Sequence, residues 1–424
     1  MTMVSVVSVM QEIEAAAAQA EQVEPRSATT LVLAELAART IQSRFGTDIS
    51  TRTSPPGAVD ARSPEPVTDL VVPMPQPAAT TVPPEPTEEA APTSPVASES
   101  GDVAAAAGSP SPTSAPSTGV SAMSFGGHNI LGINLARLPQ SGAAYERVKA
   151  LAAQSGSLNY GDNNGPNNDV LLAKAALGDK AGVLAMVRAA KGSLTPNIIH
   201  NAAARNLAAT AIALSLVSAH EEDGWLLMAR EMAYDGGQQT LLYAAGRSNN
   251  HGSAADQSLV AIDMHLNDRA HLESRVIPII RQRLGDEMGI SLRFGESVQA
   301  DPANPVTIGL PGTFADGVSL DGLLLEEQRR ESGFPNCGGY NFGASGQILI
   351  SVWLLEVAGY NAQEWGQRAI HRVFARLVAM GCAPEGDDRW QGHMYNALAG
   401  RAVLPEAVGD GKTLGITDYL FSGR

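Results

Sequence analysis

The sequence predicts an all-α protein: an α/α toroid, meaning an incomplete barrel of antiparallel helices, that follows a disordered N-terminal linker. Three observations predict this class. Apolar residues recur at helical spacing through residues 123–424, Ser, Asp, Asn and Gly separate the periodic segments, and no strong alternating pattern indicates strands. With 44% hydrophobic and 17% charged residues, the composition is ordinary for a globular protein. No repeat of fixed period is visible, which argues against a solenoid.

Residues 1–120 differ from the rest of the chain. They hold 16 of the 26 prolines, one aromatic residue (Phe45), 14 acidic and 5 basic residues, and no lysine. Within them, 30–45 has apolar residues near helical spacing, and 7–20 is a weaker candidate helix. We therefore expect a short helical N-terminal segment at 1–50 that is a possible anchor, a disordered linker rich in Pro, Ser, Thr and Ala at 51–122, and the toroid domain at 123–424.

Helical periodicity continues through the toroid domain in short segments with polar joints. This arrangement is typical of helices that pack antiparallel to their neighbours in the chain. The expected helices are 143–153, 168–177, 181–190, 197–219, 224–233, 254–266, 270–284, 346–357 and 362–380.

Charge and cysteine content exclude several classes of function. The formal net charge of −15 makes a nucleic-acid partner unfavourable. No run of about 18 apolar residues is present to span a membrane. The two cysteines, Cys337 and Cys382, exclude a disulfide framework and a four-cysteine zinc site, although they could form one bridge in an extracellular protein. The histidines show neither HxH nor HExxH spacing, so no metal is expected.

Three polar clusters interrupt the helical pattern. The first, Ser-Asn-Asn-His-Gly at 248–252, directly precedes the expected helix 254–266. Asn249, Asn250 and His251 can present amide donors and an imidazole at a helix N-terminus, where the helix dipole favours a bound anion. The alternative is a capping loop with Asn249 or Asn250 as the N-cap.

The second cluster contains Glu326, Glu327, Arg329 and Arg330, and Tyr340 follows about ten residues later. Either arginine could bind a carboxylate in a forked pair, and Tyr340 could carry a proton. The alternative is a solvated charge run with a tyrosine in the core.

The third cluster, Arg205 and Asn206, lies in the very apolar helix 197–219. It faces either a groove or a buried partner on a neighbouring helix.

In their order and spacing, these clusters resemble the alginate lyase superfamily of helical-toroid polysaccharide lyases. The resemblance covers roughly residues 131–395. It is carried by Leu-Ala-Arg-Leu-Pro-Gln-Ser-Gly-Ala-Ala-Tyr at 135–145, Asn-Asn-Asp-Val at 167–170, Ala-Arg-Asn-Leu-Ala at 204–208, Asn-Asn-His-Gly at 249–252, Asp-Gly at 321–322, residues 326–330 and Tyr340.

The resemblance implies β-elimination on a uronic-acid polymer, alginate-like or glucuronan-like, with no cofactor. Asn250 and an arginine, which we take to be Arg330, would neutralise the substrate carboxylate. Tyr340 would protonate the leaving oxygen, and on a syn substrate it would also be the base. His251 would be the base on an anti substrate, or a further carboxylate neutraliser. Substrate-binding roles would fall to Asn249, Arg205, Asn206, Arg329 and Asn168.

One departure from the family pattern concerns the second cluster. The gap between the arginines and Tyr340 is several residues longer than usual in the family, which leaves open whether Arg329 or Arg330 faces the substrate.

Two other functions compete with the lyase. One is a non-catalytic glycan-binding or display protein on a phage particle or cell surface. The other is a toroidal glycoside hydrolase that uses Asp321 with Glu326 or Asp256. The expected partner is an anionic polysaccharide. The expected location is extracellular or virion-associated, although the sequence shows no ordinary signal peptide. The N-terminal segment would then dock on a carrier protein or virion.

Overall fold

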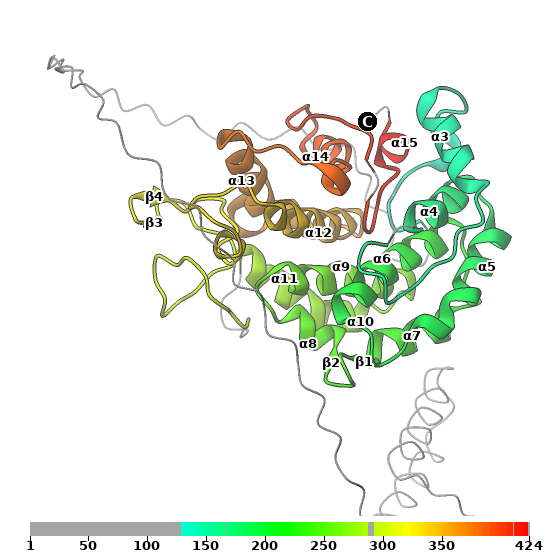
Figure 1. The fold of residues 1–424 in the computed structure, drawn as a ribbon, viewed down its shortest axis with the longest axis horizontal. Coiled ribbons are helices and arrows are strands. Elements are labelled where there is room, and N and C mark those ends of the chain that lie inside the picture. Colours follow the sequence, from blue (N-terminus) through cyan, green and yellow to red (C-terminus); the bar gives the residue numbers. More distant parts are fainter. Residues whose placement is uncertain (1–128, 166, 287–291, 410, 423–424) are drawn as a thin grey trace, which may run out of the picture. The chain divides into compact units, whose positions relative to one another are not determined.

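The computed structural model describes residues 129–165, 167–286, 292–409 and 411–422, all within one compact unit, Ala115–Arg424. This unit is mostly helical, as predicted (Figure 1). The expected N-terminal segment, its candidate helices at 7–20 and 30–45, and the linker lie outside the described residues. The α-helices are α3 (Ala143–Ala152), α4 (Asn168–Ala176), α5 (Lys180–Ala190), α6 (His200–Leu216), α7 (Asp223–Glu231), α8 (Leu241–Ala245), α9 (Asn250–His265), α10 (Arg269–His271), α11 (Ile277–Leu284), α12 (Gly339–Val357), α13 (Trp365–Ala379), α14 (Gln391–Ala399) and α15 (Thr417–Leu420).

Shorter elements connect these helices. They are η1 (Leu135–Arg137), η2 (Lys191–Ser193), the π-helical turn η3 (Leu272–Val276), η4 (Glu327–Arg329), η5 (Ala362–Glu364) and η6 (Gly386–Asp388). Two antiparallel pairs of two-residue strands complete the described secondary structure: β1 (Ala233–Tyr234) with β2 (Gln239–Thr240), and β3 (Phe314–Ala315) with β4 (Val318–Ser319).

Each of the helices predicted between residues 143 and 380 corresponds to a described helix, but some helix ends differ. Helix α9 begins at Asn250, four residues before the predicted start, because the Asn249 side chain caps it. Helix α12 begins at Gly339 rather than at 346, which places Tyr340 on its first turn. Helices α8, α14 and α15 were not predicted. Helices α8 and α15 have too few residues for periodicity to stand out, and α14 begins with the polar stretch Gln391-Gly392-His393.

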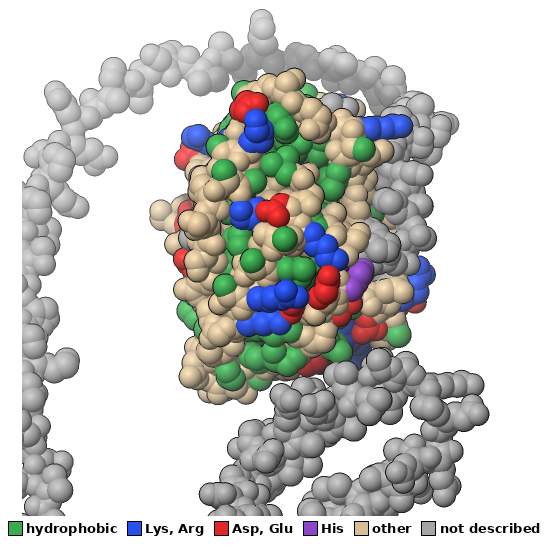
Figure 2. Space-filling view, turned by 90° about the vertical axis from the view of Figure 1, so that its right-hand side faces the viewer, with side chains coloured by type: hydrophobic (Ala, Val, Ile, Leu, Met, Phe, Trp, Pro, Cys, Tyr) green, Lys and Arg blue, Asp and Glu red, His purple; other side chains and the backbone are tan. Residues whose placement is uncertain are grey.

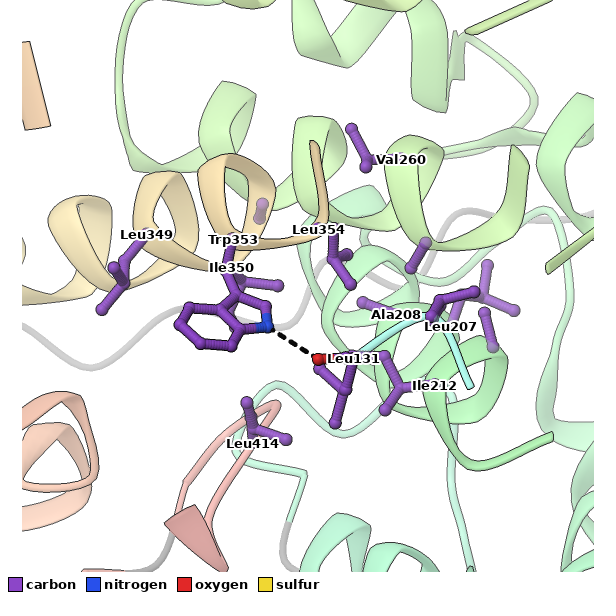
Figure 3. Close-up of a cluster of buried hydrophobic side chains, with 14 of the residues drawn as sticks. Leu131, Leu207, Ala208, Ile212, Val260, Leu349, Ile350, Trp353, Leu354 and Leu414 are labelled. Atoms are coloured by element: carbon purple, nitrogen blue, oxygen red, sulfur yellow. Dashed lines mark hydrogen bonds between the residues drawn. The ribbon is translucent and has the colours of Figure 1, made fainter. Parts of the chain in front are cut away.

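Helix α9 packs against both α6 and α12, and these three helices run through the middle of the folded unit (Figure 1). Every residue of α6 is buried, as expected for a helix that is apolar on all sides. Figure 3 shows how α12 is fixed: the Trp353 indole lies among Leu131, Ile212 and Leu414 and donates a hydrogen bond to the Leu131 carbonyl (3.0 Å). Both α6 and α9 contribute polar residues to the site described below.

Cys337 and Cys382 form a disulfide, which settles the pairing left open by the sequence. The bridge joins the segment just before α12 to the loop after α13. It therefore restrains the chain three residues before Tyr340.

We expect Cys337→Ser/Cys382→Ser to lower the free energy of unfolding. The bridge closes a loop with a sequence separation of 45 residues, for which loop-closure entropy in the unfolded chain gives about 4 kcal/mol. Urea unfolding of the oxidised protein and of the double variant measures the difference. Reductant should shift the wild-type midpoint and leave the double variant unchanged; equal midpoints without reductant would contradict the expectation.

The surface that includes α5 and α7 carries charges of both signs. Figure 2 shows Lys and Arg side chains interspersed with Asp and Glu, with no large block of one sign. Ion pairs here include Lys180 with Glu221 (2.9 Å) and Arg188 with Glu222 (2.6 Å). Among the described residues, no helix combines the length and apolar character needed to cross a lipid bilayer.

Candidate active site

A polar pocket of about 410 Å³ collects most of the residues singled out in the sequence. Its walls come from α6, α9, the segment after η4, the start of α12 and the C-terminal segment. The lining residues are Asn163, Asn201, Arg205, Asn250, His251, Gln257, Arg330, Glu331, Gly339, Tyr340, Gly343, Gln347, Asp387, Asp388, Trp390, Lys412 and Thr413.

The first wall is the N-terminus of α9. Asn249 is its N-cap, and its side-chain oxygen accepts a hydrogen bond from the His251 N–H (3.1 Å). This cap turns Asn250 and His251 into the pocket, whereas Asn249 itself does not line it. Gly252 completes the motif because any Cβ there would lie 1.9 Å from the Arg247 carbonyl oxygen. The glycine therefore lets the first turn of α9 lie against the preceding loop.

In the second wall, Arg330 contacts three neighbouring residues, Asn250, Glu327 and Tyr340. One Arg330 Nη donates to the side-chain oxygen of Asn250 and also lies 3.4 Å from a carboxylate oxygen of Glu327. The Arg330 guanidinium carbon stands 3.8 Å from the centre of the Tyr340 ring, in cation–π contact. One guanidinium therefore links the α9 N-terminus to the α12 N-terminus across the pocket.

The structure distinguishes Arg329 from Arg330, which the sequence alone could not do. Arg330 lines the pocket with Asn250 and Tyr340. Arg329 lines a separate hollow with residues 294–299. The difference arises because η4 ends at Arg329, so the two consecutive side chains leave the turn in different directions.

Glu327 is buried behind this wall and contacts it. It is only 2% exposed, and its carboxylate accepts the backbone N–H of Asn250 (2.6 Å). Burial raises its pKa to about 7, against the opposing effect of Arg330. Sequence reasoning gave Glu327 no more than a surface ion pair; its burial depends on how η4 packs in the fold, including against α12, which no local pattern reports.

His251 is held in its neutral form. Burial, together with nearby cationic groups of which His200 and Arg330 come first, lowers its pKa to about 4. The His200 and His251 rings lie 5.2 Å apart between centroids, and His200 Nδ1 lies 2.5 Å from a carboxylate oxygen of Asp235. Within the described part of the chain, His251 Nδ1 is buried without a hydrogen-bond partner. A neutral imidazole can accept a proton or donate to a ligand oxygen.

The opposite wall carries Arg205 from α6. Its guanidinium donates to the Asn163 carbonyl (2.9 Å) and to the Asn163 side-chain oxygen (3.3 Å), which also accepts from Asn201 (3.0 Å). Arg205 is therefore a second cation in the pocket. Asn206 points elsewhere: its amide donates to the carbonyls of Asp162 (2.8 Å) and Ala202 (2.9 Å). It shapes the loop that holds Asn163 and does not line the pocket.

Asn168 also lies behind the wall. It is fully buried, and its amide donates to the Lys412 carbonyl (2.7 Å). Gly165, at φ +58°, leaves room for this contact, since a Cβ there would lie 2.4 Å from the Asn168 amide nitrogen. Asn168, Asn206 and Asn249 thus position the site from behind, where the sequence suggested direct substrate contact.

The C-terminal segment adds an edge that sequence reasoning missed. Lys412 pairs with Asp387 (2.8 Å), and burial, aided by Asp387, raises the pKa of Asp388 to about 6. The signal available was the Gly-Asp-Asp-Arg-Trp stretch at 386–390, whose charged residues looked like an ordinary loop. Gln257 from α9 donates to the Thr413 hydroxyl (3.1 Å) and ties this edge to the pocket floor.

The carboxylates proposed for a hydrolase lie elsewhere. Asp321 pairs with Arg372 (2.6 Å), and Asp256 is buried against Arg283 (2.5 Å). Glu326 accepts a hydrogen bond from the Ser248 hydroxyl. None of the three lines the pocket, so the structure does not bring that set together.

Several buried polar atoms of the pocket residues have no partner among the described residues. They include Asn201 Oδ1, Arg205 Nε, His251 Nδ1 and Gln257 Oε1. Buried polar atoms are normally hydrogen-bonded. These four atoms can therefore form hydrogen bonds with a polar molecule in the pocket.

Comparison with protein-family models, with curated proteins and with solved structures finds no match to this chain.

Glu327 offers a prediction that needs no substrate. An acid whose pKa is raised in the folded state contributes stability at low pH and loses it as pH rises through the folded value. For Glu327 this window runs from about 4.5 to about 7. We expect Glu327→Gln to remove on the order of 2 kcal/mol of pH-dependent stability across that window.

Urea unfolding of the wild type and the variant at pH 5 and pH 7.5 measures this difference. Glu327→Ala is the companion variant: it also loses the acceptor for the Asn250 N–H and should be less stable than Glu327→Gln at both pH values. Parallel pH profiles of wild type and Glu327→Gln would contradict the buried, protonated carboxyl.

Proposed function

We propose that this protein is a polysaccharide lyase that cleaves an anionic uronic-acid polymer by β-elimination, built on an α/α toroid like that of the alginate lyase superfamily. The observation that carries the proposal is the contact of Arg330 with both Asn250 and Tyr340 in a pocket that also holds His251. The toroid is supported by the contacts between successive helices from α3 to α6.

The first requirement of β-elimination is to make the C5 proton of a uronate acidic. That proton lies next to a carboxylate, whose charge opposes formation of a carbanion. Arg330 and the Asn250 amide together would neutralise this carboxylate and stabilise the enolate that forms from it. Because Arg330 already contacts both neighbours, little reorganisation is needed when the substrate binds.

The second requirement is a base and an acid. The base removes the C5 proton, the electron pair forms the C4–C5 double bond, and the bond from C4 to the glycosidic oxygen breaks. Tyr340, on the exposed rim with 38% of its surface accessible, would protonate the departing oxygen. His251, neutral above about pH 4, would be the base on an anti substrate. On a syn substrate Tyr340 would perform both transfers.

The pocket also suits the proposed substrate class. Its volume of about 410 Å³ lies in the range of about 300–1,000 Å³ that is common for small-ligand sites. The lining holds three cationic groups, Arg205, Arg330 and Lys412, of which Lys412 is paired with Asp387 and Arg330 lies 3.4 Å from a carboxylate oxygen of Glu327. A polymer with a regularly spaced carboxylate could engage both arginines, and its hydroxyls could satisfy the unpartnered amide oxygens of Asn201 and Gln257.

The test uses the purified full chain and a panel of polymannuronate, polyguluronate, glucuronan, hyaluronan and pectate. Ultraviolet absorbance follows the conjugated C4–C5 double bond. We expect a rise on at least one polymer, which also names the substrate. If the protein is folded by circular dichroism and absorbance rises on none, the lyase is excluded.

A hydrolase remains the second candidate because one observation favours it. Asp388 lies in the pocket with a pKa raised to about 6, as a general acid requires. Hydrolysis would release reducing ends without any unsaturated sugar, so a reducing-sugar assay run beside the absorbance assay separates the two. Retention on a polymer column with neither product would indicate the glycan-binding or display protein.

The location follows from the substrate. A polyuronate lies outside the cell, so we propose an extracellular or virion-associated protein, and the Cys337–Cys382 bridge suits an oxidising compartment. The N-terminal segment would dock the catalytic unit on a carrier. Deletion of residues 1–50 should then release the protein from its native particle or surface, and unchanged association would exclude docking.

A further inference from the structure

We propose that His220, Asp223 and His265 form a zinc site, separate from the pocket. Among the described residues, these three are brought together with potential ligand atoms all within 4.8 Å of one another. The spacing along the sequence gave no sign of this group, because His265 lies more than forty residues beyond the other two. Two imidazoles and a carboxylate are a ligand set that zinc commonly takes, with a water molecule in the fourth position.

The carboxylate stands between the two rings. His220 Nδ1 lies 3.1 Å from one oxygen of Asp223, and His265 Nε2 lies 3.0 Å from the other. In a tetrahedral site with Zn–N bonds of about 2.0–2.1 Å, neighbouring ligand atoms are about 3.3 Å apart. The two N–O distances are therefore close to those of a tetrahedral site, and the two ring nitrogens, which lie within 4.8 Å of each other, would move closer together as an ion binds.

The two rings have the matching separation. Their centroids are 5.1 Å apart, and the rings are stacked with 14° between their planes, so one ring would tilt to direct both nitrogen lone pairs at one ion. Two imidazoles bound tetrahedrally to one zinc ion have centroids about 5 Å apart, given the same bond lengths. Hydrogen bonding to Asp223 alone would fix each ring nitrogen, but it would not by itself require the rings to take this separation.

Burial leaves one open side. The His265 side chain is fully buried, whereas those of Asp223 and His220 are 36% and 41% exposed. A water ligand can enter from that side. His265 is also the last residue of α9, where the carbonyl end of the helix dipole favours a cation.

The ion would have a structural role. Asp223 begins α7, so the site fastens the loop between α6 and α7 to the C-terminal end of α9. Asn250 begins the same helix, and sixteen residues at about 1.5 Å per residue put the two ends about 22 Å apart along the axis. Zinc would therefore stabilise the helix that carries Asn250 and His251 without touching the substrate.

The experiment uses the tag-free full chain after treatment with EDTA and dialysis. Calorimetric titration with Zn²⁺ should give one ion per chain, and zinc in excess of about 100 times Kd should raise Tm by about 5 °C. Co²⁺ should give the visible absorbance of a tetrahedral site. No sugar polymer is present, so the outcome does not depend on the proposed lyase.

His220→Ala and Asp223→Asn, both at partly exposed positions, are the test variants; each should weaken zinc binding at least about tenfold. His393→Ala is the matched control, since its imidazole lies 3.6 Å from Glu406, outside the cluster, and zinc binding should be retained. Circular dichroism checks that all variants fold. The proposal is wrong if the wild-type chain does not bind one zinc ion, or if both test variants bind zinc as tightly as the wild type. The cluster would then be only two histidine–aspartate hydrogen bonds.

Discussion

Replacing Tyr340 with Phe is expected to reduce kcat on the uronate polymer by about 10³-fold or more, because the phenol would supply the proton to the leaving oxygen. The substitution removes a single hydroxyl from a side chain that is 38% exposed, and the Phe ring can keep its contact with Arg330. The loss should therefore appear in kcat, with Tm and polymer binding close to the wild type.

The control for Tyr340→Phe is the equivalent change at an exposed tyrosine outside the pocket. Tyr243 suits this purpose, because it is 51% exposed and its ring, like that of Tyr340, contacts an arginine, Arg293, at 3.8 Å. Tyr243→Phe should retain full activity. Full activity in Tyr340→Phe would remove this residue from the mechanism, even if the protein proved to be a lyase.

The second large effect is expected for Arg330→Ala, at about 10²–10³-fold in kcat/KM, because the variant loses the cation that would stabilise the enolate. Arg330→Lys should recover only part of this activity, since a lysine keeps the charge but cannot contact Asn250 and a carboxylate with one planar fork. Initial rates of double-bond formation over a range of polymer concentrations measure both variants.

The chain contains an unusually close control for this prediction. Arg329 precedes Arg330 in sequence but lines a different hollow, with residues 294–299. Arg329→Ala carries the same change of net charge and should retain activity within about twofold. Equal losses in Arg329→Ala and Arg330→Ala would indicate general attraction of the anionic polymer to a basic surface, and the specific role of Arg330 would be abandoned.

The helical class and the positions of the long helices could be predicted from the sequence because apolar periodicity is a local property. Helix α6 shows this well, since its run of Ala, Leu and Ile leaves little choice but burial. The residues at which the helices begin were harder to predict from the sequence. Asn250 and Tyr340 lie in the first turns of α9 and α12, where polar residues that cap or line a site look like loop residues.

The pocket could be predicted only in part. Asn250, His251, Arg330 and Tyr340 were chosen from motif order, and the structure brings all four into one pocket together with Arg205. Asn168, Asn206 and Asn249 were expected to touch substrate, but their amide groups are used by backbone or cap hydrogen bonds. Sequence identifies which residue types can do chemistry; it does not report which of their hydrogen-bonding atoms are already occupied.

The remainder depends on contacts between distant segments. Asp388 and Lys412 line the pocket because the segments around α14 pack there, and the burial that raises the pKa of Glu327 arises from the packing of η4 in the fold. The choice between Arg329 and Arg330 depended on how a single turn of η4 is oriented. Such information resides in tertiary structure, and no spacing rule contains it.

The tie between Asn168 and Lys412 has a consequence for the order in which the protein becomes competent during its synthesis. The two residues are 244 positions apart, and Gln257 and Thr413 bridge another 156. Arg205 is synthesised about 200 residues before Lys412 and Thr413. Closing such long loops is slow and comes late in folding. A nascent chain that has not yet reached Lys412 would therefore carry Asn250, His251, Arg330 and Tyr340 without this edge of the pocket.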